Sequence, residues 1–285
     1  MCPANWRAVI ETCFDRLGIS ADSYGGTAWT FKLPPTVYPV YAYLNEEWLC
    51  LDIPLDSTVT YHSAWTSLQG NATIRGAGKF ALEVRPRRLH LQAEIPLIEE
   101  PTPDLLLQQT LTGFNDALSG TGPGTRKPLR EGSDAVERLT GIFAEGGWSY
   151  SRKLANGLSL EIPVRQVPQL AHITLNENVC RLHTQLVRAD VFDDAARFGL
   201  AILFLSASRE IRWVRPYVDT QNSCETAGFE VCFMALPCAG ELSHAFSALS
   251  TALQLCGAEA LVMQDSSIAK QFLLHRAPIQ KEDNV

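Results

Sequence analysis

Several signals that would announce a particular activity are missing from these 285 residues. The eight cysteines form no Cys-X-X-Cys pair, and neither a Gly-X-Ser-X-Gly elbow nor a His-Glu-X-X-His motif occurs. The longest apolar run, from Phe198 to Leu205, is far shorter than the ~18 residues that a membrane-spanning helix needs. No basic-then-apolar signal peptide opens the chain. We therefore expect a cytoplasmic protein with no membrane partner, no metal site, no catalytic residues and no cofactor.

Basic residues are also fewer than acidic ones. The net charge is −7, and the acids outnumber the bases in both halves of the chain. An acidic surface repels polyanions, so we expect no nucleic-acid partner. Five cysteines lie inside apolar patterns, where a free cysteine behaves as a small hydrophobic residue; they are Cys13, Cys50, Cys180, Cys232 and Cys256. We predict that all eight thiols are reduced.

Two glycine-rich stretches invite comparison with a phosphate-binding loop. A Walker loop ends in Gly-Lys-Ser/Thr, so that backbone amides cradle the phosphate and the lysine reaches it. The stretch from Gly76 to Lys79 is followed by Phe80, and in the stretch from Gly120 to Gly124 no lysine follows a glycine. Both are predicted to be ordinary loops.

His172, Cys180 and His183 have side chains that could bind a metal. A turn at 176–178 would pair residue 175 with 179, and hence 172 with 182. His172 and Cys180 would then share one face of the sheet, while His183 would point to the other. Because zinc ligands must converge on one point, this register argues against a metal site. A Ser-His-Asp or carboxylate site assembled in space remains an alternative.

A short segment of the chain occurs twice. Leu44-Asn45-Glu46 returns 131 residues later as Leu175-Asn176-Glu177, each time between segments that favour β-strands. The elements around the two copies recur in the same order, at nearly constant spacing. Such a pattern indicates an internal duplication.

The predicted fold is α+β, a tandem repeat of two helix–three strands–helix–two strands–helix units with antiparallel sheets. The domains are residues 1–118, a linker at 119–132 that is flexible by composition, and residues 133–285. Val84-Arg85-Pro86 aligns with Val214-Arg215-Pro216, which leaves a longer loop at 217–227 in the second copy. The predicted helices are 6–17, 59–68, 103–118, 133–145, 190–206, 241–255 and 259–274.

This order of elements, in an acidic unit of this size, resembles the small chaperones of bacterial type III secretion, the Tir chaperone family. The resemblance covers nearly the whole chain twice and has no diagnostic short motif. It implies a protein without enzymatic activity that binds an extended segment of a protein partner, a secreted effector. Members of that family are usually single units that form dimers, whereas this chain fuses two. A regulatory or scaffolding protein that reuses the fold is the alternative.

The predicted helix at 190–206 differs from its counterpart in the first copy. Asp190 is placed to cap it, and the stretch from Phe198 onward is apolar on every side. A helix that covers one sheet needs only an apolar stripe, so this helix should bury a second surface. In the chaperones that the chain resembles, the middle helix commonly forms the dimer contact. We therefore predict a monomer with an internal pseudo-dimer, and an inter-repeat interface at Phe198, Ile202, Phe204 and Leu205.

Overall fold

The computed structural model describes residues 5–85, 87–97, 103–119, 133–164, 168–176, 179–221 and 224–276. All of the predicted linker except Ser119 lies outside these residues, and so does the second glycine-rich stretch. Residues 5–119 are called half one below, and residues 133–276 are called half two.

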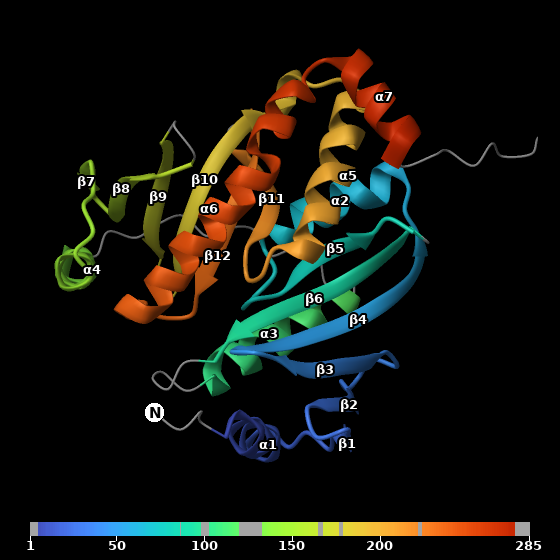
Figure 1. The fold of residues 1–285 in the computed structure, drawn as a ribbon, viewed down its shortest axis with the longest axis vertical. Coiled ribbons are helices and arrows are strands. Elements are labelled where there is room, and N and C mark those ends of the chain that lie inside the picture. The colour runs from blue at the N-terminus through green and yellow to red at the C-terminus, as the bar shows by residue number, and fades with distance from the viewer. Residues whose placement is uncertain are drawn as a thin grey trace, which may run out of the picture.

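Half one is an antiparallel sheet with helices packed on it (Figure 1). In chain order its elements are α1 (Trp6–Arg16), β1 (Asp22–Tyr24), β2 (Ala28–Lys32), β3 (Pro39–Asn45), β4 (Trp48–Thr58), α2 (Tyr61–Asn71), β5 (Lys79–Glu83), β6 (Arg88–Pro96) and α3 (Asp104–Leu118). The ring of Phe14 on α1 packs against Trp29 and Phe31 of β2. Both β2 side chains are buried, so α1 covers the buried face of the sheet.

Half two repeats this order and adds one helix. Its elements are α4 (Ser133–Glu145), β7 (Arg152–Leu154), β8 (Gly157–Ile162), β9 (Gln169–Asn176), β10 (Val179–Arg188), a 3₁₀ turn (Ala189–Val191), α5 (Asp194–Glu210), β11 (Arg215–Gln221), β12 (Cys224–Phe233), α6 (Ala239–Val262) and α7 (Ser266–Arg276). One continuous cluster of buried apolar residues runs through both halves. The α+β prediction with two antiparallel sheets is confirmed.

The two sheets have the same strand order. The first runs β1-β2-β3-β4-β6-β5, and the second, read from its opposite end, runs β7-β8-β9-β10-β12-β11. The registers also agree on every strand. One row of directly paired residues crosses the first sheet as Asp22, Thr30, Tyr41, Asp52, Gln92 and Lys79. The corresponding row of the second sheet is Arg152, Ser159, His172, His183, Glu230 and Arg215.

Each half has four strands before its middle helix, whereas the sequence predicted three. The additional strand, β1 or β7, has only three residues. In β1 all three are exposed, so the strand has no apolar alternation by which to recognise it. Its backbone pairing with the neighbouring strand, and not burial, is what makes it a strand.

The matched rows correct the alignment of the two copies. Lys79 corresponds to Arg215, so matching Val84-Arg85 to Val214-Arg215 was wrong. Val84 and Arg85 lie in the turn after β5, while Arg215 begins β11. The predicted long loop at 217–227 is the hairpin of β11 and β12. The extra length of half two lies mostly in its helices: α5 has 17 residues and α2 has 11, α6 has 24 and α3 has 15, and α7 has no counterpart in half one.

Two helices end at the glycines that the sequence indicated. Gly18 (φ 68°) follows α1, and Gly147 (φ 70°) follows α4, both in the left-handed conformation that glycine adopts most readily. The predicted cap at Asp190 was wrong, because the side chain of Asp193 accepts the Ala196 amide and begins α5. Asp190 instead pairs with Arg188. The helix predicted to stop before Gly257 continues through it.

α6 is long and apolar enough to cross a membrane by length and composition alone, and 39% of that stretch is buried inside the protein. Its buried face, which includes Leu242, Ala245 and Leu249, lies against β10 and β12. This face packs α6 onto the sheet of half two.

Candidate functional site

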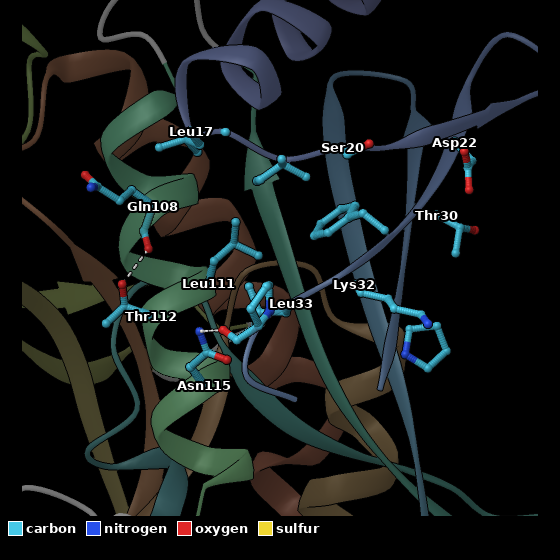
Figure 2. A pocket seen from close by; sticks show the side chains of 15 residues that line it. Leu17, Ser20, Asp22, Thr30, Lys32, Leu33, Gln108, Leu111, Thr112 and Asn115 are labelled. Carbon is cyan, nitrogen blue, oxygen red and sulfur yellow. Dashed lines mark hydrogen bonds between the residues drawn. The ribbon is translucent and has the colours of Figure 1, made fainter. Parts of the chain in front are cut away.

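A groove of about 690 Å³ opens on half one (Figure 2). Its walls come from the residues between α1 and the start of β1, from the second part of β2 with the start of β3, and from α3. Its lining residues are Leu17, Gly18, Ile19, Ser20, Asp22, Thr30, Phe31, Lys32, Leu33, Pro34, Pro39, Gln108, Leu111, Thr112 and Asn115.

The groove exists because β1 is shorter than the strand that it pairs with. β1 begins at Asp22, opposite Thr30, while β2 continues to Lys32. Before Asp22 the chain leaves the end of α1 through Gly18 and does not pair with β2. Within the described residues, no strand therefore pairs with the outer edge of β2 beyond Thr30. A free strand edge presents backbone amides and carbonyls that an extended chain can pair with.

The floor of the groove is apolar and its wall carries polar groups. Leu17, Ile19, Leu33 and Leu111 line it with aliphatic side chains. On α3, the Asn115 side-chain amide donates a hydrogen bond to the carbonyl of Pro34 at 3.1 Å. The Asn115 Oδ1 atom is buried and has no hydrogen-bond partner among the described residues. A buried acceptor without a partner costs free energy.

A second polar cluster crosses the sheet of half two. The Ser159 hydroxyl lies 2.9 Å from His172 Nδ1, and the rings of His172 and His183 are 5.6 Å apart between centroids. Burial lowers the pKa of His172. The next residue in this row is Glu230, which is fully buried and forms an ion pair with Arg215 at 2.8 Å.

The register of this cluster differs from the predicted one. Asn176 pairs with Val179, so the turn is one residue shorter and His172 lies opposite His183. The two histidines therefore share a face, whereas Cys180 is on the other face and is buried. No group of three or more His, Cys, Asp and Glu side chains converges as metal ligands within the described part of the chain.

The predicted interface residues lie on two sides of α5. Phe198 stacks edge-on against Tyr61 of α2, with ring centroids 6.0 Å apart. Ile202 lies with Phe198 beside Val59 and Leu82 of half one. Leu205 is fully buried, seven residues after Phe198 on the same helix face. Phe204 instead packs on Phe229 in the core of half two, 4.7 Å away.

The contact between the halves has a two-fold pattern. α5 packs against β5, and α2 packs against β11, with α2 and α5 side by side (Figure 1). Arg197 of α5 lies over the ring of Trp65 on α2 at 5.4 Å. The edge strands β5 and β11 lie next to each other at the centre of this arrangement.

Two buried cations make reciprocal bonds across the contact. Lys79 pairs with Glu94 at 2.8 Å in its own sheet and donates to the carbonyls of Ile211 and Val214 in half two. Arg215 pairs with Glu230 in its own sheet and donates to the carbonyls of Ile74 and Gly78 in half one, at 2.7 and 3.2 Å. Neither cation stands out in the sequence, because a lysine or arginine at a strand end is most often solvated.

A search of protein-family models, curated proteins and solved structures finds no match to this chain. The likeness to type III secretion chaperones therefore rests only on the order of elements, the acidity and the size of the unit.

Proposed function

We propose that the protein is a non-enzymatic, cytoplasmic protein-binding module that binds an extended segment of a partner protein in the groove of half one. The observation that carries the proposal is the coincidence of an apolar groove with a strand edge that is left open beyond Thr30. The resemblance to type III secretion chaperones supports the same function, with a secreted effector as the partner. A regulatory or scaffolding role for the same groove is the alternative.

The geometry suits an extended segment better than a folded surface. Such a segment would pair its backbone with β2 beyond Thr30 and place alternate side chains on the apolar floor. Backbone pairing gives affinity for many sequences, and the side-chain contacts select among them.

Panning a phage-displayed library of linear 12-residue peptides against the intact chain tests this proposal. We expect enriched peptides that bind the wild-type protein and lose at least about tenfold in affinity to Thr112→Arg, in the groove wall. The matched control is Ser247→Arg, at the equivalent exposed position of α6. If no peptide is enriched over an unrelated protein, or if both variants weaken binding equally, the proposed function is wrong.

A second candidate function follows from the Ser159–His172 pair. A serine beside a histidine is the core of many acyl-transfer sites. Ser159 is only 5% exposed, which leaves little access for a substrate, so we favour peptide binding. A fluorophosphonate reagent separates the two, because stoichiometric labelling at Ser159 would establish a reactive serine and favour an enzyme.

A further inference from the structure

The part of half two that corresponds to the groove has the same backbone hydrogen bond after its first helix. After α1, the Ile19 amide donates to the Phe14 carbonyl at 2.9 Å. After α4, the Trp148 amide donates to the Phe143 carbonyl, also at 2.9 Å. The two helix ends therefore match residue by residue, with Ile19 in the position of Trp148 and Leu17 in that of Gly146.

The opposite wall matches as well. Asn115 of α3 donates to the Pro34 carbonyl at 3.1 Å, and the Ser250 hydroxyl of α6 donates to the Pro163 carbonyl at 2.9 Å. Pro34 lies four residues after Thr30, and Pro163 lies four residues after Ser159. Thr30 and Ser159 hold the same place in the two rows of paired residues. This correspondence places Leu111 of the groove at the position of Phe246 in half two.

Aromatic rings fill this place in half two. The Trp148 ring packs on Phe246 at 5.2 Å and on Phe143 at 5.9 Å, both edge-on. A side chain at Gly146 could not coexist with it, since a Cβ atom there would lie 2.3 Å from the Trp148 ring. Half one has a leucine at that position, and its smaller Ile19 and Leu111 leave the groove open.

We propose that the groove of half one is the single peptide site of this chain, and that it binds an aromatic side chain of the partner segment where half two holds Trp148. This inference rests on the proposed function. In half two the indole ring of Trp148 fills this place, whereas in half one the aliphatic side chains of Ile19 and Leu111 stand there, beside Phe31 as the one aromatic lining residue. Edge-on aromatic packing and the large area that a ring buries make such a side chain a strong anchor.

The chemistry of the partner follows from this comparison. The segment is extended where it meets β2, and it carries a tryptophan or phenylalanine that enters between the end of α1 and α3. Among the described residues of half two, the rings of Trp148 and Phe246 occupy the corresponding place, so we expect no second segment to bind there. One chain then binds one segment, although its two halves share one architecture.

The test uses one synthetic dodecapeptide from the library selection, titrated by calorimetry into the intact chain. We expect a stoichiometry of one, and a loss of at least about tenfold in affinity when the aromatic residue of the peptide is replaced by alanine. The double variant Leu17→Gly/Ile19→Trp, which copies the half-two arrangement into half one, should fill the groove and abolish binding. Circular dichroism checks that this variant is folded. If it is not folded, Leu111→Phe narrows the same groove from the other wall.

The converse double variant, Trp148→Ile/Phe246→Leu, should open the second groove and raise the stoichiometry from one to two. A wild-type stoichiometry of two would overturn the inference and leave the proposed function intact, and so would selected peptides without an aromatic residue. Undiminished binding by a folded Leu17→Gly/Ile19→Trp protein would also overturn it. Failure to select any peptide would instead contradict the proposed function itself.

Discussion

At the scale of single residues, the contact between the halves depends on charges that are removed from water. Lys79 is fully buried and meets one carboxylate and two backbone carbonyls. The Glu94 carboxylate accepts, besides Lys79, the Trp213 amide of half two at 3.1 Å. A buried charge is tolerated only with such partners, so removal of one member leaves the others unsatisfied.

We predict that Lys79→Met, which keeps the length of the side chain, destabilises the protein by about 3–5 kcal/mol, since Glu94 would remain buried without its cation. Urea unfolding followed by circular dichroism measures this. The matched control is Lys32→Met at an exposed position, which should change the free energy of unfolding by less than about 0.5 kcal/mol. A loss below about 1 kcal/mol for Lys79→Met would show that the cation is not essential to the contact.

His172 makes stability depend on pH. Burial lowers its pKa, so the folded protein holds this proton less tightly than the unfolded chain does. Its contribution to stability is full above the ordinary histidine pKa of about 6.5, and is lost as the pH falls through that value toward the lower folded pKa. His172→Asn keeps an amide near Ser159 but does not titrate. We expect the free energy of unfolding to fall less between pH 7.5 and 5.5 in this variant than in the wild type, and parallel curves would contradict this.

At this scale, features that depend on one residue type could be predicted from the sequence, whereas features that depend on the register between strands could not. The positions of Gly18 and Gly147 at helix ends followed from residue type, because left-handed backbone favours glycine. The shared face of His172 and His183 did not, because one residue more or less in the turn reverses the faces of a strand. Lys79 stood in a glycine-rich stretch that was interpreted as a loop, and only the packing of half two explains its burial.

At the scale of elements, α5 is a helix that packs against both halves. Its apolar stretch has one side on its own sheet, through Phe204 and Phe229, and another on half one, through Phe198 and Ile202. The sequence indicated this second surface, because apolar residues surround the helix. It could not indicate that α7 also covers α5, with Ala269 packed against Gly199.

We predict that Ile202→Asp destabilises the full chain by more than about 4 kcal/mol, because a carboxylate would be buried without a partner between the halves. Val191→Asp is the matched control, since Val191 is 67% exposed just before the same helix. It should change the free energy of unfolding by less than about 0.5 kcal/mol. Similar losses in the two variants would contradict the placement of Ile202.

At the scale of the whole molecule, the two halves are related as the two subunits of a symmetric dimer would be. Each middle helix packs on the edge strand of the other half, and each buried cation reaches carbonyls of the other half. Such reciprocal contacts are the pattern of a two-fold interface. The repeat of Leu-Asn-Glu was enough to suggest duplication. The register, the short edge strands and the groove depended on contacts between distant segments, which a single sequence does not display.

The measurement that tests the internal pseudo-dimer most directly is the mass of half two alone, residues 133–285, by light scattering next to the full chain. We predict that the full chain has its monomer mass of 31.4 kDa, because its interface is satisfied within the chain. The fragment exposes Phe198, Ile202 and Arg215, so it should dimerise or aggregate. A fragment that stays monomeric and stably folded would contradict the pseudo-dimer, because α5 would then have no second partner to bury against.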